Sequence, residues 1–286
     1  MIGNTLVILI ILTNKSMKSP MNYLLVNLAV ADMIVGIFLV PRSILQYFIA
    51  LPDGSKGQIF CEVLSIGNMT WVGGAASVFS LAAICFERYF AVMHPYSARL
   101  RLNCKKVGRI VVTSWLFASA LNAPMFGQRS NHDQEKKRCI EEWPRELSWL
   151  QKAFSFLWFT AAGFAPLAIM FVFYSRVIYS LWFKKNQVQG TQLAVLKSRK
   201  RVTKMVVIVS VVFLVCWIPT LLLYATLHDN VAFPISGMSA TGSIMVLFNS
   251  AINPFIYSFQ SENFRRCLKD IVSCRKPRNN RIAPPN

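Results

Sequence analysis

One ionisable side chain lies inside an otherwise apolar stretch of this sequence. Asp32 ends the run Asn27–Asp32, and a charge within a lipid-spanning helix is costly unless it has partners. Ser77, Asn249 and Asn253 fall at depths in other apolar stretches from which they could face Asp32. Their oxygen atoms predict a polar pocket suited to a small hard cation such as Na⁺. The alternative is a plug in which these side chains bond only to one another.

Three short motifs place reactive or bulky groups at the ends and bends of apolar stretches. Glu87–Tyr89 puts an Arg at an inner boundary, where it could also be a simple interfacial anchor. Cys216–Pro219 puts an indole one turn before a proline, and Asn253–Tyr257 puts a proline outward of a phenol. A proline frees a backbone carbonyl and allows a kink, so these motifs favour a bundle that bends.

Seven apolar blocks would position these residues. The chain is 54% hydrophobic and 15% charged with mean hydropathy +0.43, whereas a soluble domain would be about 25% charged. A spanning helix needs about 20 apolar residues, so the last six blocks can span and we expect the first helix to be truncated at its N-terminal side. The blocks are Ile2–Leu12, Met21–Ala50, Val63–Met93, Val107–Phe126, Leu150–Phe183, Val202–Leu227 and Phe233–Phe259.

Basic residues gather on one side of this predicted bundle. Of the 31 Lys and Arg residues, 23 lie in the segments 13–20, 88–109, 176–204 and 260–286. Because such residues favour the cytoplasmic side, we expect a multi-pass plasma-membrane protein with its N-terminus outside and its C-terminus in the cytoplasm. The net charge of +19 would also suit nucleic acid. Here the cations flank spans, where the anionic lipid bilayer attracts them, so we expect no nucleic-acid partner.

The seven cysteines include one pair on the outer side. The other five lie inside spans or on the reducing side: Cys85, Cys104, Cys216, Cys267 and Cys274. Only Cys61 and Cys139 would face the outside, where disulfides persist. We therefore predict a Cys61–Cys139 disulfide that fastens the loop after the fourth span over the mouth of the bundle.

We expect one domain over residues 1–274. Residues 262–274 carry apolar side chains at helical spacing among cations, which predicts an amphipathic helix on the inner leaflet. Residues 275–286 are polar and Pro-rich and are expected to form a disordered cytoplasmic tail. Cys267 and Cys274 would be palmitoylated or remain free thiols.

With these motifs in order along the spans, the chain resembles the rhodopsin-like (class A) G-protein-coupled receptors. That resemblance implies an all-α membrane protein, a bundle of seven transmembrane helices plus a short amphipathic inner-leaflet helix. It covers nearly the whole chain. The matching residues are Gly3–Asn4, Leu28–Asp32, Glu87–Tyr89, Pro95, Trp115, Pro166, Tyr174, Cys216–Pro219 and Asn253–Tyr257.

The resemblance further implies a two-state switch driven by an extracellular ligand. The sixth span would move outward and open a cytoplasmic cleft for a heterotrimeric G protein. The implied switch residues are Arg88, Tyr174, Phe213, Trp217, Pro219, Asn253, Pro254 and Tyr257. The implied G-protein contacts are Arg88, Pro95 and Tyr96.

Two positions depart from the family pattern. Many members carry an acid on the sixth span that pairs with the Arg of the third-span motif, and Arg199 stands there in this chain. Arg88 must then pair with Glu87 or another group, from which we expect raised ligand-free signalling. Cys61 lies two residues further from Arg88 than the family pattern has it, which puts the local helix geometry in doubt.

Absences narrow the ligand. Amine receptors have an acid where this chain has Thr70, and opsins have a retinal-binding Lys where it has Leu247. Because the seventh block contains no Lys at all, we expect no retinal. Apart from an allosteric Na⁺, we expect no cofactor. The stretch Asn27–Pro41 resembles the neuropeptide branch, especially receptors of the RFamide kind.

Two carboxylates just after Cys139 could pair with a cation of a basic peptide. The expected ligand-lining residues are Gln46, Thr70, Trp71, Glu141, Glu142, Tyr224 and Ser243. The alternatives are a lipid or other small-molecule ligand, or a receptor that signals without ligand.

Other classes of function have little support in the residues. His94, His132 and His228 are far apart in the sequence and have no spacing typical of a metal site or a nucleophile–base pair, so an enzyme is not expected. A channel or transporter would need polar residues along a whole route, but the one charge placed within the spans is Asp32.

Overall fold

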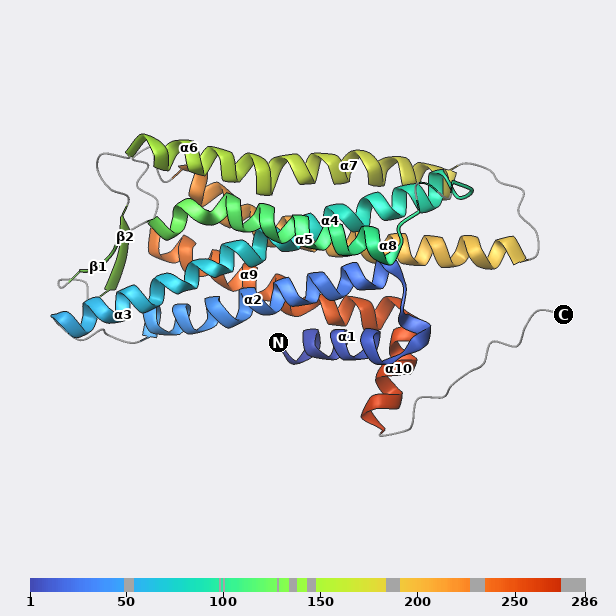
Figure 1. Ribbon diagram of the computed structural model, residues 1–286, viewed down its shortest axis with the longest axis horizontal. Helices are drawn as coiled ribbons and strands as arrows, with labels where there is room; N and C mark the ends of the chain where they lie inside the picture. Colours follow the sequence, from blue (N-terminus) through green and yellow to red (C-terminus); the bar gives the residue numbers. More distant parts are fainter. Residues whose placement is uncertain are drawn as a thin grey trace.

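The computed structural model describes residues 1–48, 54–97, 99, 101–127, 129–133, 138–142, 148–183, 191–226 and 235–273. These form an elongated bundle of roughly parallel and antiparallel helices (Figure 1). The α-helices are α1 (Ile2–Thr13), α2 (Pro20–Phe48), α3 (Ser55–Ser65), α4 (Met69–Met93), α5 (Cys104–Asn122), α6 (Ser148–Trp158), α7 (Ala165–Ile178), α8 (Thr191–Thr226), α9 (Ile235–Gln260) and α10 (Glu262–Val272).

Short 3₁₀ and π segments join or prolong these helices, so that the described residues make seven helical columns. The 3₁₀ segments are η1 (Lys15–Met17), η2 (Ile66–Asn68) and η3 (Ala123–Gly127), and the π-helical ones are η5 (Phe159–Phe164) and η6 (Tyr179–Phe183). The third column is α3–η2–α4 and the fifth is α6–η5–α7–η6. The predicted seven-helix fold class is confirmed.

Four stretches of the described chain are long and apolar enough to cross a membrane by length and composition: Pro20–Ile44, Ser55–Met93, Ala153–Phe183 and Val195–Leu221. α5 and α9, which the sequence also predicts as spans, are more polar, with cations in the first two turns of α5 and amide and hydroxyl groups along α9. Polar side chains are tolerated in a bundle when they face other helices.

The third column is interrupted at η2, between Cys61 and Arg88, where the sequence spacing is unusual. A Cβ on Gly67 would lie 2.7 Å from Cδ of Arg42, so the glycine leaves room for this side chain of α2. The Arg42 guanidinium then donates a hydrogen bond to Oδ1 of Asn68 at 2.7 Å. After this tighter 3₁₀ turn the column continues as α4.

The sixth column begins earlier than hydropathy predicts. The sequence predicts an inner loop that reaches residue 201, but the structure starts α8 at Thr191. Residues 193–201 are mostly Leu, Ala, Lys and Arg, which are good helix formers although too charged for lipid. α8 therefore extends inward beyond its apolar part.

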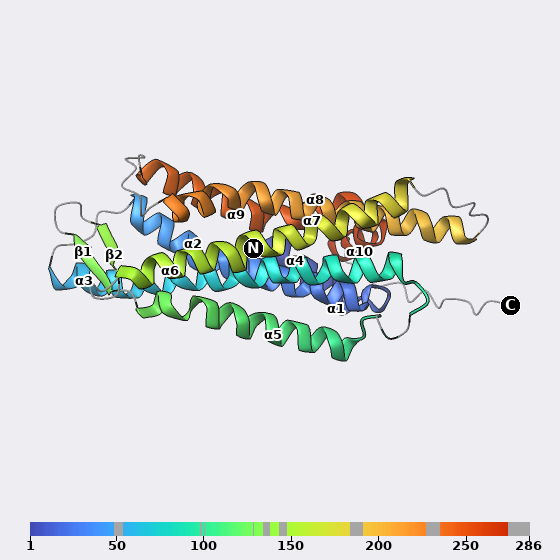
Figure 2. The same cartoon turned by 90° about the horizontal axis from the view of Figure 1, so that it is seen from above.

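The predicted disulfide between Cys61 and Cys139 is present, with 78 residues between its partners in sequence. Cys139 lies on β2 (Arg138–Glu142), which pairs antiparallel with β1 (Arg129–Asp133). This hairpin, which the sequence did not predict, sits at one end of the bundle beside α3 (Figure 2). The disulfide thus fixes the hairpin to the third column at the predicted outer end.

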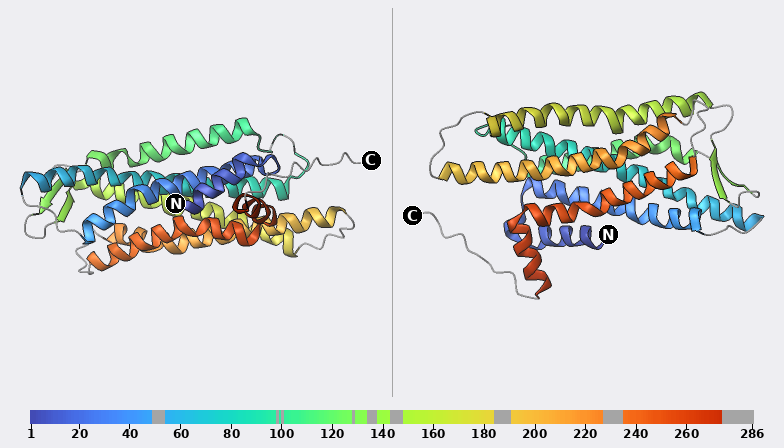
Figure 3. Two further views of the ribbon diagram at one scale, coloured as in Figure 1. Left: turned by 90° about the horizontal axis from the view of Figure 1, so that it is seen from below. Right: turned by 180° about the vertical axis from the view of Figure 1, so that it is seen from behind.

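At the other end of the bundle, α10 runs across the long axis and packs on α9 and α1 (Figure 3). The Ser261 hydroxyl caps it by accepting a hydrogen bond from the Phe264 N–H at 3.2 Å. Phe264 and Cys267 face the bundle and are buried, whereas Arg265 and Arg266 are exposed. This matches the predicted amphipathic helix, while the domain division itself stays a prediction.

Burial of Cys267 bears on its chemistry. The loss of solvent, and then the nearby Asp270 carboxylate, raise the pKa of the Cys267 thiol. A protonated, buried thiol is a poor nucleophile, which weighs against palmitoylation in this conformation. Cys274 and the predicted tail lie outside the described residues.

Candidate functional site

The buried carboxylate of Asp32 connects three columns. Asn253 on α9 donates a hydrogen bond from Nδ2 to Oδ2 of Asp32 at 2.7 Å, and the Ser77 hydroxyl on α4 donates to Oδ1 at 3.4 Å. Asp32 itself is on α2, and all three side chains are at most 2% exposed. The structure therefore brings together three of the four residues predicted for the polar pocket.

Around Asp32 some buried oxygen atoms have no hydrogen-bond donor. Within the described residues, Oδ1 of Asn253 and Oδ1 of Asn249 have no hydrogen-bond partner, and Asn249 lies one helical turn before Asn253 on the same face of α9. Buried acceptors without donors are rare and call for a water or a cation. A carboxylate with neutral amide and hydroxyl oxygens is a donor set that fits Na⁺.

A second polar chain holds neighbouring columns in place. The Trp115 indole N–H on α5 donates to Oδ1 of Asn27 at 2.8 Å, and Nδ2 of Asn27 donates to the Ser80 hydroxyl at 2.7 Å. On the other side, Nδ2 of Asn4 on α1 donates to the carbonyl of Ser250 at 2.9 Å. These bonds fix α1, α2, α4, α5 and α9 around the Asp32 site.

Three tryptophans from different columns meet between the Asp32 site and the hairpin end. The ring centroids of Trp71 and Trp158 are 5.5 Å apart, and each lies within 6.3 Å of the Trp217 ring. Phe213 stacks on Trp217 at 5.3 Å. We call Trp71, Trp158 and Trp217 the tryptophan cluster. Its rings provide a large apolar surface whose edge-to-face geometry is favourable.

Glycine makes the tryptophan cluster possible. A Cβ on Gly74 of α4 would lie 2.2 Å from Cη2 of Trp217, so the indole rests directly against the α4 backbone. Trp158, which the sequence did not single out, is held by its indole N–H, which donates to Oδ1 of Asn122 at 3.0 Å. Asn122 and Trp158 are 36 residues apart, so neither periodicity nor a motif pointed to the pair.

The predicted ligand-lining residues are only partly described. Thr70 is buried beside Trp71 on α4, and its hydroxyl has no hydrogen-bond partner in the part of the chain that the structure describes. Ser243 is half-buried on α9. Gln46 lies on α2, Tyr224 on α8, and Glu141 and Glu142 on β2, but the side chains of these four are outside the described part of the structure.

Two more of the predicted switch residues, Tyr174 on α7 and Tyr257 on α9, are buried in the bundle. The hydroxyl of Ser210 on α8 lies 3.4 Å from the phenolic oxygen of Tyr174 on α7, which is buried. Tyr257 on α9 is also buried, with its ring 6.4 Å from that of Phe264. Among the described residues, no hydrogen bond or ion pair joins Arg88, Tyr174 and Tyr257 to one another. Pro219 and Pro254 lie inside α8 and α9.

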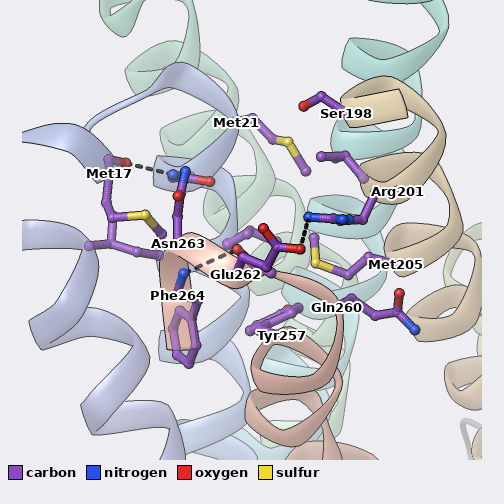
Figure 4. A pocket seen from close by; sticks show the side chains of 15 residues that line it. Met17, Met21, Ser198, Arg201, Met205, Tyr257, Gln260, Glu262, Asn263 and Phe264 are labelled. Carbon is purple, nitrogen blue, oxygen red and sulfur yellow. Dashed lines mark hydrogen bonds and ion pairs between the residues drawn. The ribbon is translucent and has the colours of Figure 1, made fainter. Parts of the chain in front are cut away.

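At the inner end, Arg88 forms an ion pair with Glu87, as the sequence allows. A different ion pair, not foreseen from the sequence, joins α8 to α10. Nη1 of Arg201 lies 2.8 Å from Oε1 of Glu262, beside a cavity of about 170 Å³ (Figure 4). Lys200, next to Arg201, lies 5.4 Å above the Trp182 ring of η6.

The two remaining predicted contact residues lie in the loop between α4 and α5. Tyr96 is 97% exposed. The carbonyl of Pro95 accepts a hydrogen bond from Nη2 of Arg101 at 2.7 Å. An exposed ring on an otherwise basic loop is available to a partner.

Residues 3–257 match the model of the family described as 7 transmembrane receptor (rhodopsin family). The chain belongs to this family. Its rhodopsin-family membership places it among multi-pass plasma-membrane receptors that act through G proteins, and these are not enzymes. In the described residues, no three His, Cys, Asp or Glu side chains gather as they would around a metal ion.

Several curated rhodopsin-family receptors are similar along nearly the whole chain. The Allatostatin-A receptor of Bombyx mori is 30% identical, with 98% of this chain and 78% of that receptor aligned. Neuropeptide FF receptor 2 of Mus musculus is also 30% identical, with 96% and 70% aligned. The Pyroglutamylated RF-amide peptide receptor of Rattus norvegicus is 27% identical, with 98% and 71% aligned. Each of these receptors is named for a peptide.

The close approach at Gly74 predicts the effect of a single methyl group. Gly74→Ala should lower the melting temperature of the purified receptor, because overpacking a dense core costs about 1–3 kcal/mol. Helix propensity alone would favour the alanine by about 1 kcal/mol. Gly108→Ala on α5 is the matched control, since nothing lies within 4 Å of its added Cβ. Equal melting temperatures for both variants would contradict the observed contact.

Proposed function

We propose that this chain is a receptor for an extracellular neuropeptide and activates heterotrimeric G proteins from the plasma membrane. The peptide names of its relatives support the ligand class, and family membership supports the G-protein partner. The structural observation that carries the proposal is that α8 makes contacts along its whole length, from the tryptophan cluster to α10. This one helix contacts the tryptophan cluster through Trp217, α7 through Ser210, and α10 through Arg201.

The proposed orientation has the hairpin end outside the cell and the α10 end in the cytoplasm. The disulfide at the hairpin end supports it, because disulfides persist outside the cell. The excess of Lys and Arg at the α10 end supports it as well. The same cations would face the anionic inner leaflet of the bilayer, which accounts for the basic composition without a nucleic-acid partner.

The proposed ligand site lies at the hairpin end, above the tryptophan cluster. Thr70 and Trp71 on α4 would contribute a hydroxyl and an apolar surface, and Ser243 on α9 would contribute a second hydroxyl. Four further contacts are proposed because they belong to outer segments: Gln46, Tyr224, Glu141 and Glu142. The acids of β2 would attract a basic peptide, since a charge-assisted hydrogen bond to a carboxylate is among the stronger polar contacts.

The proposed switch is a movement of α8 between two packed states. Pressure on the tryptophan cluster would move Trp217 and the stacked Phe213, and Pro219 would allow α8 to bend. The inner end of α8 would then leave α10 and break the pair between Arg201 and Glu262. Lys200, the residue before Arg201, lies over the Trp182 ring of η6 in the fifth column.

Na⁺ is proposed as an allosteric ion held by the Asp32 site. Asp32, Ser77, Asn249 and Asn253 would supply the oxygens, and the ion would supply positive charge beside a buried carboxylate. A bound Na⁺ would stabilise the packed arrangement of α2, α4 and α9. The other reading is a plug closed by the direct bond from Asn253 to Asp32.

The ligand proposal is tested by measuring G-protein activation in cells that express the full chain. The probes are a panel of amidated peptides that includes neuropeptide FF, pyroglutamylated RF-amide peptide and allatostatin A. We expect a response to at least one basic peptide, lost in Arg88→Ala at equal surface expression. Glu141→Gln should raise the half-maximal concentration about tenfold, as one charged contact contributes about 1.4 kcal/mol.

Glu62→Gln is the matched control, because Glu62 is an exposed acid at the same end of the bundle. An equal shift in Glu62→Gln would point to general charge loss and reject a specific contact at Glu141. If no peptide in the panel causes a response but ligand-free signalling is strong, the receptor assignment stands and the proposal of a peptide ligand is rejected.

The ion pair between α8 and α10 predicts a change in ligand-free signalling. Arg201→Gln should raise basal G-protein activity about 1.4- to fivefold, since an exposed ion pair contributes about 0.2–1 kcal/mol to the resting state. Arg199→Gln removes the same charge nearby and should change little. The reversed pair, Arg201→Glu with Glu262→Arg, should restore basal activity. If the reversed pair behaves like the single change, the ion pair is not part of the resting state.

The Na⁺ proposal predicts an ion-specific gain in stability. With sodium at ten times its dissociation constant, linkage gives about 1.4 kcal/mol over the same receptor in choline at equal ionic strength. The melting temperature in the two salts measures this gain. Asp32→Asn should remove the difference. Identical melting of the parent in both salts would support the hydrogen-bonded plug instead.

A further inference from the structure

The loop between α4 and α5 is held by cationic side chains that bond to its backbone. α4 ends at Met93, and α5 begins at Cys104. Between them, Nη2 of Arg101 donates to the carbonyl of Pro95 at 2.7 Å. The Ser97 N–H donates to the His94 carbonyl at 3.2 Å, closing a turn around Tyr96. The exposed tyrosine thus sits in a defined turn.

Lys106, in the first turn of α5, fastens the other half of the loop. Its ammonium group donates to the carbonyls of Arg99 at 2.6 Å and of Arg101 at 3.0 Å. Its backbone N–H also donates to Oδ1 of Asn103 at 2.8 Å, which caps the helix. One residue therefore ties the loop backbone to the start of α5, and through Arg101 to Pro95.

The position of Lys106 is unfavourable for the helix that contains it. The N-terminus of a helix carries partial positive charge, so a cation in the first turn is destabilising. Lys105 stands in the same turn, at the same end of the bundle, and is exposed. Attraction to anionic lipid would explain either lysine equally well. Within the described residues, the contacts with the loop carbonyls distinguish Lys106 from Lys105.

We propose that Lys106 is a positioning residue that holds the loop between α4 and α5 so that Tyr96 is presented to the G protein. This inference rests on the proposed function, because it names the G protein as the partner of the exposed ring. Arg101 assists by fixing the carbonyl next to Tyr96. Lys106 itself need not touch the partner.

Preorganisation explains how such bonds act on coupling. A loop that spends only a fraction of its time in the binding geometry weakens apparent affinity by that fraction. Without the ammonium group, the carbonyls of Arg99 and Arg101 would bond to water, and the loop would sample other shapes. The partner would then have to order it on binding. The effect is expected on G-protein affinity and not on ligand affinity.

The test compares the full-length parent with Lys106→Met, Lys106→Arg and Lys105→Met. In membranes, the rate of GTPγS exchange is measured against G-protein concentration, with the activating peptide at saturation. We expect Lys106→Met to raise the half-maximal G-protein concentration three- to tenfold, the scale of one typical net hydrogen bond in a protein. Lys105→Met should leave it unchanged, and Lys106→Arg should restore most of it. Peptide affinity and the maximal rate should stay the same.

Two further measurements separate positioning from direct contact. Amide hydrogen exchange over residues 94–103 should increase in Lys106→Met and not in Lys105→Met. Adding Lys106→Met to Tyr96→Ala should cause little further loss, because both changes remove the same contact. Additive losses, or equal coupling of Lys106→Met and Lys105→Met, would overturn the inference. A parent that activates no G protein at all would instead overturn the proposed function, while the exchange data would still decide whether Lys106 orders the loop.

Discussion

The rest of the bundle depends on how one buried carboxylate is satisfied. Asp32 lies where neither lipid nor water can stabilise a charge, so its partners must come from other helices. Asn253 and Ser77 provide them, which fixes α9 and α4 relative to α2. The Asn27–Trp115 and Asn4–Ser250 bonds then place α5 and α1 around the same centre. The polar interior therefore sets the register of helices whose apolar surfaces would tolerate many packings.

Above that centre the interior changes character, from hydrogen bonds to aromatic surface. The tryptophan cluster has broad ring contacts, and Trp217 rests on a glycine instead of on a side chain. Aromatic rings have two favourable geometries, edge-to-face and offset stacking, so more than one arrangement of these rings is favourable. The hydrogen-bonded part of the interior thus forms a fixed frame around Asp32. The aromatic part next to the proposed ligand site can adapt more easily.

Sequence patterns predicted features that a single strong physical rule governs. The apolar blocks predicted the helical columns. The restriction of disulfides to the outer side of the membrane predicted the Cys61–Cys139 pair, and the isolated charge predicted the Asp32 site. Contacts between residues that belong to no motif could not be predicted from the sequence. The Arg201–Glu262 pair joins two solvated ends where many charges could pair, and Trp158 with Asn122 joins columns with no motif. Hydropathy also failed to predict the start of α8, because a helix can extend beyond the apolar part that lipid would surround.

The inward extension of α8 has a mechanical consequence. From Pro219 to Arg201 the helix is about 27 Å long at 1.5 Å per residue, and it continues to Thr191. If the proline acts as a fulcrum, a tilt of about 10° carries Arg201 sideways by roughly 5 Å, the rise of about one helical turn. A small rearrangement of rings near the fulcrum is thus amplified along a stiff arm. The length of that arm is set by residues too polar for the membrane. It determines how far the inner end of α8 moves and therefore how wide the bundle opens toward the cytoplasm.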